Sequence, residues 1–409
     1  MNILLINHYA GSPLHGMEYR PYYMARAWQK LGHRVRIVAA GFSHVRSRQP
    51  PARPGIQREV VDGVEYCWIA AGQYAGNGLG RIRNMMSFVL GLARHGAELA
   101  RDFAPDVVIA SSTYPLDAIP ARSIARRHGS RLVHEVHDLW PLSPMELGNM
   151  SRWNPFIAVM QFAENFAYSR ADKVVSMLPC AEPHMREHGL AAGKFVYVPN
   201  GIDVAEWEAN TVPLPDEVGA SLSRFRKTYP FLVGYAGGHG LSNALDPLID
   251  AAVALRGERV GFVLVGQGPE KARLRARAEQ LGLDNILFMD PVSKGAIPAL
   301  LAGVDAAYIG WLRRPLYRFG VSPNKLFDYM MAERPVIHAV EAGNDLVAES
   351  GCGFSVPPED PAAVVGAVRE LMAASPESRR EMGARGRRHI LAHHTYDVLS
   401  ARFLEAMRS

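Results

Sequence analysis

The chain has 409 residues, too many for one ordinary hydrophobic core, and this length predicts roughly two or three domains, of which we take two. Its residues are 48% hydrophobic and 21% charged, without a low-complexity tract or a disordered charged tail, which predicts a folded soluble protein. The net charge of +5 comes from dispersed arginines and is compatible with anionic ligands or an anionic membrane surface.

The first residues, MNILLINHYA, predict a β-strand rather than a signal peptide, because no basic leader precedes the short apolar run. No stretch approaches the ~20 apolar residues of a membrane-spanning helix, so we expect any membrane contact to be peripheral. Three distant cysteines, Cys67, Cys180 and Cys352, offer neither a disulfide framework nor metal-ligand spacing. This usage favours a cytoplasmic protein.

Short apolar runs alternate with helical patterns along both halves of the chain, which predicts two parallel α/β sheets of the doubly wound, Rossmann-like kind. The expected strands of the first half are NILLINHY, HRVRIVAA, VEYCWIA, DVVIASS, RLVHEVHD, KVVSML and FVYVPN. Those of the second half are FLVGYAG, VGFVLVGQG, NILFMD, AAYIG, PVIHAV and GFSV. The polar, proline-containing stretch over residues 200–230 is interpreted as a linker without strongly periodic helix. The last segment is an amphipathic helix that could pack on either domain.

Open α/β sheets bind ligands beyond the carboxyl ends of their strands. Two such sheets therefore predict an interdomain cleft, in which one domain holds a nucleotide and the other an acceptor. We therefore expect the functional residues at these strand ends.

Two strand ends of the first domain carry polar candidates. After the first strand, Gly16 permits close backbone approach to a ligand, and a helix starting near residue 18 would present free N–H groups to an anion. Arg20 could contact a phosphate or be an ordinary solvated first-turn residue. At the end of RLVHEVHD, His137 could donate to a sugar hydroxyl and Asp138 could accept from one; the alternatives are a structural histidine and a capping aspartate. His134, inside the strand, is expected to pack in the core.

The second domain has three glycine-rich or loop segments at its strand ends: YAGGHGLSNALDP, LVGQGPEK and FMDPVSKGAIP. The first lacks both the Gly-x-Gly-x-x-Gly order of dinucleotide folds and the Gly-Lys-Ser/Thr of a P-loop, which disfavours NAD binding and ATP hydrolysis. Its backbone could still form a phosphate nest. Lys294 in the third segment is either a ligand of the phosphates or a surface lysine.

The segment SPNKLFDYMMAE predicts a helix with Ser322 as its cap and Pro323 at its first position. Lys325 lies in the first turn, where the helix dipole prefers an anion, and a bound phosphate would resolve that conflict. Asp328 lies one turn later and either pairs with Lys325 or accepts from ribose hydroxyls.

The sequence shows no Asp-x-Asp, no His/Cys cluster of metal-ligand spacing and no Gly-x-Ser-x-Gly nucleophile elbow. We therefore expect no metal cofactor. Lysine and helix N-termini would neutralise a diphosphate leaving group.

Taken together, these segments resemble the retaining family 4 glycosyltransferases of the GT-B fold, and within them bacterial enzymes of the WbuB-like type that build surface polysaccharides such as O-antigen or capsule. The stretches that carry the resemblance include HDLWPLSP, VPNGID and SPNKLFDYMMAERPVI. The resemblance implies an acceptor-binding domain over residues 1–203, which the C-terminal helix 393–409 joins, and a nucleotide-sugar-binding domain over residues 204–392.

By this resemblance Lys325 contacts the donor diphosphate, Asp328 holds the ribose, His137 lies near the donor sugar, and the loop with Gly16 covers the donor. The catalytic residues would be His137 and Lys325, and the acceptor contacts Arg20 and Asp138. The expected donor-binding residues are Gly16, Gly238, His239, Gly240, Asn243, Gly266, Gly268, Pro291, Lys294, Ser322, Pro323, Asn324, Lys325 and Asp328.

The chain departs from the family pattern at two places. The family's first glutamate would fall at Gly320, so its sugar contact is missing or comes from elsewhere. Where many relatives carry an arginine and a lysine, this chain has GGHGLSNA, and His239 or Asn243 would take part of that role.

The sequence therefore predicts a metal-independent, retaining transferase that moves an N-acetylated hexosamine or its deoxy form from a UDP-sugar to a lipid-linked saccharide. Its place would be lipopolysaccharide O-antigen or other surface-polysaccharide biosynthesis at the inner face of the cytoplasmic membrane, without nucleic acid. The segment GRIRNMMSFVLGLARHGAELAR is either an interfacial membrane helix or a plain core helix. The rival functions are a nucleotide-sugar epimerase or hydrolase, which needs an acid/base pair, and a non-catalytic scaffold in a polysaccharide-assembly complex.

Overall fold

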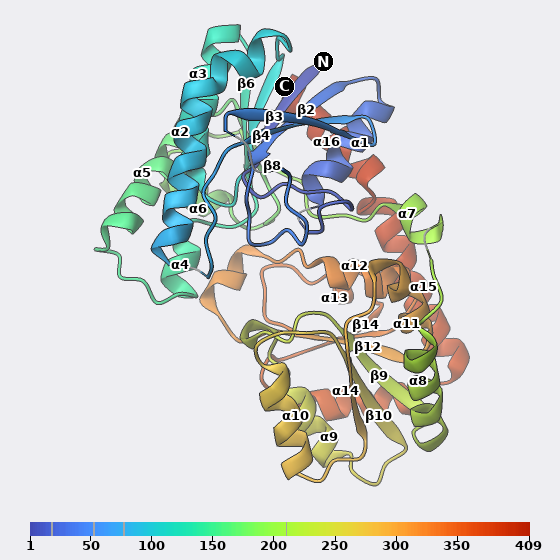
Figure 1. Ribbon diagram of the computed structural model, residues 1–409. Coiled ribbons are helices and arrows are strands. Elements are labelled where there is room, and N and C mark those ends of the chain that lie inside the picture. The colour runs from blue at the N-terminus through green and yellow to red at the C-terminus, as the bar shows by residue number, and fades with distance from the viewer. Residues whose placement is uncertain (18, 52–53, 77, 210) are drawn as a thin grey trace. The chain divides into compact units, whose positions relative to one another are not determined.

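The computed structural model describes residues 1–409 except 18, 52–53, 77 and 210. The chain forms two compact units (Figure 1). Unit 1 comprises Met1–Asn200, Phe319–Ser322 and Tyr396–Ser409, and unit 2 comprises Gly201–Arg318 and Pro323–Thr395. Each unit is built on its own mainly parallel sheet with helices on both faces, which confirms the predicted fold class.

The sheet of unit 1 has the strand order β3-β4-β2-β1-β5-β6-β7-β8. All neighbours pair in parallel except β3 and β4, which form an antiparallel hairpin at the edge. The strands are β1 Asn2–Ile6, β2 Arg34–Ala40, β3 Ile56–Val61, β4 Val64–Ile69, β5 Val107–Ala110, β6 Arg131–Val136, β7 Lys173–Ser176 and β8 Phe195–Tyr197. Only β3 was not predicted, because an edge strand with polar side chains lacks the apolar run that marks the others.

Helices cover both faces of this sheet (Figure 1). On one face α1 and α16 share a core in which the rings of Tyr23 and Tyr396 stack with centroids 5.0 Å apart. On the other face α2 and α3 bury Phe88, Leu92 and Ile124. The helices are α1 Arg20–Lys30, α2 Leu79–Arg101, α3 Ala118–His128, α4 Leu142–Glu146, α5 Pro155–Arg170, α6 Glu182–Glu187 and α16 Tyr396–Arg408.

The sheet of unit 2 is parallel throughout, with the order β11-β10-β9-β12-β13-β14. Its strands are β9 Phe231–Ala236, β10 Val260–Val265, β11 Ile286–Met289, β12 Ala306–Gly310, β13 Val336–Ala339 and β14 Gly353–Val356. Ala236 pairs with Val265, so β9 and β10 end side by side and their following loops meet.

Helices α9 Asp246–Ala254 and α14 Pro361–Ala373 pack on one face of this sheet, and α12 Asn324–Met331 packs on the other. The remaining helices of unit 2 are α7 Val204–Ala209, α8 Asp216–Thr228, α10 Lys271–Gln280, α11 Ile297–Ala302, α13 Leu346–Ser350 and α15 Pro376–His393.

The stretch 200–230, interpreted from the sequence as a linker without strongly periodic helix, contains the helices α7 and α8. Helix α8 has Asp216 and Glu217 in its first turn and Arg226 and Lys227 in its last, an arrangement that the helix dipole favours. Its single fully buried side chain, Leu222, is too little apolar surface for a periodicity argument to detect.

In the part of the chain that is described, every helix is too short or too polar to cross a membrane.

Candidate functional site

Two glycine-rich turns meet at the adjacent carboxyl ends of β9 and β10. The His239 N–H donates to the Gln267 carbonyl at 2.9 Å. A Cβ atom at Gly266 would lie 1.9 Å from the Gly237 carbonyl oxygen, and one at Gly268 would lie 2.4 Å from the His239 carbonyl oxygen. Gly266 and Gly268 are thus required for the close approach of the two turns.

His239 lies between these turns with a fully buried side chain. Neither of its ring nitrogens has a hydrogen-bond partner among the described residues. Burial, together with the charges of Lys271 and Lys325, lowers the pKa of His239 to about 4. The ring is therefore neutral at pH 7, with one nitrogen able to donate and the other able to accept.

Lys325 lies in the same region, at the start of α12. Its Nζ donates to the Tyr235 hydroxyl at 3.1 Å and to the side-chain carbonyl of Asn243. It also lies 4.9 Å from the centre of the Tyr235 ring. Burial lowers the pKa of Lys325 to about 8. No carboxylate of the described residues forms an ion pair with it, so the expected alternative of a pair with Asp328 is not what the structure has.

The start of α12 differs from the prediction. Pro323, not Ser322, is the N-cap, and no side chain caps the helix. Ser322 is engaged elsewhere: its hydroxyl accepts the Asn200 N–H at 2.8 Å, and its carbonyl accepts the Asn200 side-chain amide at 2.9 Å. The first amides of α12 thus receive no side-chain acceptor, which is the arrangement that favours a bound anion.

Asp328 lies one turn further along α12 and is half-buried. Burial raises its pKa to about 6, while Lys294 lowers it and Glu206 raises it. Lys294 forms an ion pair with Glu206 of α7, with 3.0 Å between Nζ and Oε1. Lys294 therefore influences Asp328, and its own charge is already partnered.

The other expected donor residues of unit 2 lie in the loops around this cluster. Gly238 accepts the Tyr235 hydroxyl at 2.6 Å, and Gly240 directly precedes the short helix that contains Asn243. Pro291 is exposed in the loop after β11, and Asn324 is exposed at the first position of α12.

In unit 1, His137 lies at the carboxyl end of β6 within a buried polar network. Its Nε2 lies 2.9 Å from the Ser111 hydroxyl and 3.4 Å from Glu135. Burial alone would raise the pKa of Glu135, but the charges of Arg20 and His137 hold it well below its ordinary value. An ionised Glu135 that accepts the Ser111 hydroxyl at 2.6 Å orients the groups around His137.

Arg20 is part of the same network and is buried. Its guanidinium bonds Glu135 at 2.9 Å and the carbonyls of Val198 and Pro199. Through these partners Arg20 connects β6 to the residues after β8. Arg20 is therefore a buried structural residue and not a solvated one, which was one of the two expected alternatives.

Asp138 accepts from the Leu139 N–H at 3.0 Å and from the Ser143 hydroxyl, and burial raises its pKa. Helix α4 begins at Leu142 and has no side-chain cap, so these contacts orient the turn after β6 and are not the expected helix cap. The expected packing role of His134 is confirmed, because its buried ring contacts the Ala110 carbonyl at 3.2 Å.

Gly16 lies in the loop before α1 with a φ of 68°, and a Cβ there would lie 2.3 Å from the Ser47 hydroxyl. The positive φ and the close contact with Ser47 therefore explain why this position is a glycine, without a bound ligand.

Sequence reasoning missed several members of these clusters: Tyr235, Ser111, Glu135 and Asp117. Asp117 is fully buried, and burial raises its pKa to about 7, with a lowering contribution from His137. Glu135 had a usable signal, since a charged residue inside an otherwise buried strand requires a partner. Tyr235 had none, because an aromatic residue in a strand is ordinary core.

Comparison with known proteins gives two family matches. Residues 15–201 match the glycosyl transferase 4-like domain, and residues 230–374 match the glycosyl transferases group 1. Between them the two models account for most of both units.

Two curated proteins align with about two thirds of the chain. The putative colanic acid biosynthesis glycosyl transferase WcaI of Escherichia coli K12 is 27% identical over 66% of this chain and 67% of its own. The probable glycosyltransferase WbjE of Pseudomonas aeruginosa is 22% identical over 65% of this chain and 66% of its own.

Solved structures share the fold over nearly the whole chain. Anabaena HepE in complex with UDP and glucose has a TM-score of 0.67 at 16% identity and covers 100% of both chains. WaaG, a glycosyltransferase involved in lipopolysaccharide biosynthesis, has a TM-score of 0.66 at 15% identity and covers 99% of this chain and 98% of its own. Sucrose-phosphate synthase from Thermosynechococcus elongatus has a TM-score of 0.72 at 16% identity, with 99% and 98% covered. These likenesses confirm the GT-B fold.

Proposed function

The chain belongs to the family 4 glycosyltransferases, which are retaining enzymes of the GT-B fold, and we propose that its donor is a UDP-sugar whose diphosphate is bound at the start of α12. The observation that carries this proposal is Lys325: a half-buried ammonium without a carboxylate partner among the described residues, at a helix start without a side-chain cap.

The charges around Lys325 favour an anion of this kind. The lysine weakens its own helix, because the dipole places positive potential at the first turn. The negative charge of a diphosphate would offset the desolvation cost of the ammonium and the unfavourable interaction of the lysine with the helix dipole. The free amides of the first turn would donate further hydrogen bonds to it. Its neighbours Tyr235 and Asn243 fix the position of Nζ.

Other residues of unit 2 extend this donor site. His239 would supply one nitrogen as a donor to a phosphate or sugar oxygen, which gives its unpartnered ring a hydrogen bond. Asp328 would accept from the ribose hydroxyls, and the loop with Pro291 would contact the base. Support for uridine comes from the HepE structures, whose bound ligands are UDP and UDP-glucose.

We propose that His137 contacts the sugar of the donor. It stands at the end of a strand, held by Ser111 and the ionised Glu135, and could donate to a donor-sugar hydroxyl as charge develops at the anomeric carbon. In retention of this type the acceptor hydroxyl attacks from the face that the diphosphate leaves, and the diphosphate takes up the proton. Lys325 would stabilise the leaving charge without a divalent ion.

The proposed sugar is an N-acetylated hexosamine or its deoxy form, and the proposed acceptor is a lipid-linked saccharide of a surface polysaccharide. The printed functions of WcaI in colanic acid biosynthesis and of WaaG in lipopolysaccharide biosynthesis support this class of acceptor. A glutamate at position 320 would have contacted the sugar, and Gly320 leaves that contact to another group.

A peripheral contact of unit 1 with the cytoplasmic membrane belongs to this proposal. On α2, Met85 and Phe88 are buried in the core and are not available to a lipid surface. The apolar residues of α2 that are available are Leu79, Met86 and Leu90, which are 81%, 39% and 63% exposed. Exposed Arg83 and Arg94 on the same helix suit an anionic lipid surface.

The function is tested by offering the purified chain a panel of UDP-sugars, one at a time, with and without a bacterial lipid extract. We expect UDP release and sugar transfer into lipid with one donor, and only when the extract is present. Conversion of the sugar without lipid would identify an epimerase or hydrolase instead. Donor binding without turnover under either condition would identify a scaffold.

A further inference from the structure

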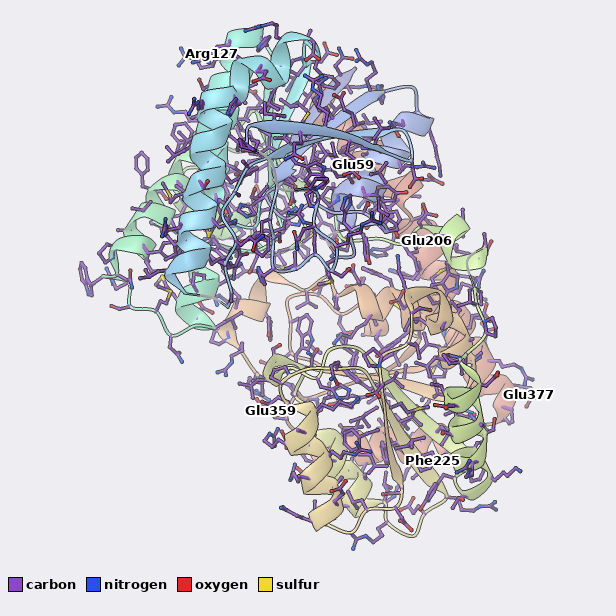
Figure 2. The ribbon with its side chains drawn as sticks, in the orientation of Figure 1. Glu59, Arg127, Glu206, Phe225, Glu359 and Glu377 are labelled. Atoms are coloured by element: carbon purple, nitrogen blue, oxygen red, sulfur yellow. The ribbon has the colours of Figure 1, made fainter. Side chains whose placement is uncertain are left out.

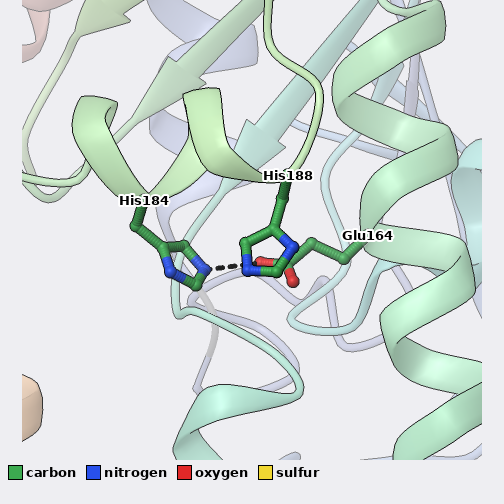
Figure 3. A group of neighbouring side chains, drawn as sticks. All are labelled: Glu164, His184 and His188. Atoms are coloured by element: carbon green, nitrogen blue, oxygen red, sulfur yellow. Dashed lines mark hydrogen bonds and ion pairs between the residues drawn. The ribbon is translucent and has the colours of Figure 1, made fainter.

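A carboxylate and two imidazoles converge between α5 and α6 of unit 1 (Figure 3). Glu164 projects from α5, and His184 and His188 project toward it from α6 and its C-cap. One possible ligand atom from each residue lies within 4.8 Å of the other two. The two histidines are one helical turn apart, so their rings lie together, with centroids 4.5 Å apart.

The carboxylate is the unusual member of this group. Glu164 is 1% exposed. Its oxygens accept from the Tyr168 hydroxyl at 3.1 Å and the Gln161 amide at 2.8 Å, and Oε1 lies 3.0 Å from His184 Nε2. No lysine or arginine among the described residues forms an ion pair with it. A buried carboxylate held by neutral donors is stabilised when a cation joins it.

We propose that Glu164, His184 and His188 bind one Zn²⁺ ion, with water in the fourth position. Two imidazoles and one carboxylate favour zinc over magnesium or calcium, which prefer oxygen ligands. Ligands at about 2.0–2.1 Å from a tetrahedral zinc lie about 3.3 Å apart. The 3.0 Å between His184 Nε2 and Glu164 Oε1 is already close to this spacing.

The ion can reach this position from solvent. Gln161 is half-buried, and its amide nitrogen contacts both Glu164 and His188 Nδ1, the latter at 2.9 Å. A bound ion would displace this amide from Glu164 and His188. Neighbouring Asn165 is exposed, so the entry lies at the surface.

The ion would join α5 to α6. Helix α6 and a residue just before it contact Phe319, which lies shortly before α12. The Cys180 N–H, just before α6, donates to the Phe319 carbonyl at 3.0 Å, and the His184 ring lies 5.4 Å from that of Phe319. The chain runs from Phe319 directly to Pro323, the N-cap of α12. We therefore expect zinc to stabilise unit 1 and this segment without taking part in sugar transfer.

The test is metal binding by the full chain after chelator treatment, titrated with Co²⁺ alone and with Zn²⁺ alone. We expect one high-affinity ion per chain, a tetrahedral Co²⁺ absorption spectrum that Zn²⁺ abolishes, and a higher Tm with Zn²⁺. Because ligands are lost outright, His188→Ala and Glu164→Gln should each weaken binding more than about 100-fold. Half-exposed His188 makes the first variant safe for folding, and Glu164→Gln keeps the shape of the side chain.

The matched control is His393→Ala. His389 and His393 are also one turn apart, on α15, with ring centroids 4.9 Å apart, but they belong to no such cluster among the described residues. Removing this pair should leave the high-affinity ion in place. The proposal is overturned if His188→Ala binds Zn²⁺ as the unaltered chain does, or if the unaltered chain shows no high-affinity ion. The second result would leave His184 simply as a hydrogen-bond partner of Glu164.

Discussion

Lys325 is the residue on which the donor assignment depends. Its place in the first turn of a helix could be predicted from SPNK, and so could the conflict with the helix dipole. Its contacts with Tyr235 and Asn243 could not, because these residues are far away in the sequence and only the folded sheet brings them to α12.

The lowered pKa of Lys325 predicts how donor binding depends on pH. A diphosphate prefers the protonated lysine, so affinity is full below the pKa of about 8 and is lost as the pH rises through it. Above pH 8 we expect the affinity for UDP to fall by up to about tenfold per pH unit. Titration calorimetry between pH 7 and 9.5 measures this fall. An affinity that stays constant to pH 9.5 would contradict a role for the lysine charge, and Lys325→Met should show weaker binding that no longer varies over this range.

Gly320, where the resemblance would place a glutamate, has a backbone conformation that disfavours a side chain. Its φ of 104° is a conformation that side-chain-bearing residues rarely adopt. Gly320→Glu should therefore lower the free energy of unfolding by about 1–3 kcal/mol, the usual cost of such backbone strain. Gly366→Glu on α14 is the control, because that glycine has helical backbone and open space around it. Denaturant unfolding compares the two, and equal stability of both variants would mean that the backbone at 320 accepts a side chain.

At the scale of single elements, the strands of the two sheets were the most predictable features. A buried parallel strand is a continuous apolar run, and such runs stood out in both halves. Helix α8 and edge strand β3 were not predicted, because each buries little apolar surface. The start of α12 was placed one residue early, since Ser322 hydrogen-bonds Asn200 and that contact depends on tertiary structure.

Helix α2 carries the prediction about membranes. Replacing Leu79, Met86 and Leu90 together with serine removes exposed apolar area that would otherwise enter the lipid interface. Binding to anionic phospholipid vesicles should weaken by at least about tenfold, since each buried side chain contributes on the order of 1 kcal/mol. Sedimentation with vesicles measures the bound fraction of each variant.

The control for this helix is a pair of serine substitutions at Leu281 and Leu391 of unit 2, which are 38% and 39% exposed, as Met86 is. These should leave vesicle binding unchanged. If the α2 variant binds vesicles as tightly as the unaltered chain, α2 is an ordinary amphipathic helix whose inner face simply completes the core.

At the scale of the whole molecule, two Rossmann-like units follow from the repeated alternation of strands and helices (Figure 2 shows their side chains). What could not be predicted is that unit 1 takes in the short segment Phe319–Ser322 from the middle of the second half. The place of this segment in unit 1 depends on contacts such as that of Cys180 with Phe319, which cannot be predicted from a sequence pattern.

The charge arrangement of the whole donor site predicts transfer without a divalent ion. Lys325 and the α12 amides would neutralise the leaving diphosphate, so initial rates at 25 °C should be unchanged by EDTA and by added Mg²⁺. A rate that EDTA abolishes and Mg²⁺ restores would contradict this account. The zinc ion proposed between α5 and α6 concerns stability, and its removal should appear in the Tm rather than in these initial rates.

The most direct test of the donor site is the affinity for UDP of two lysine variants, measured by titration calorimetry at pH 7. Charged hydrogen bonds are worth about 1.5–3 kcal/mol, so Lys325→Met should weaken UDP binding by roughly 10- to 150-fold. Lys294→Met should change it little, because that lysine is exposed and already paired with Glu206. Equal affinity of Lys325→Met and the unaltered chain would contradict the assignment of the diphosphate to the start of α12.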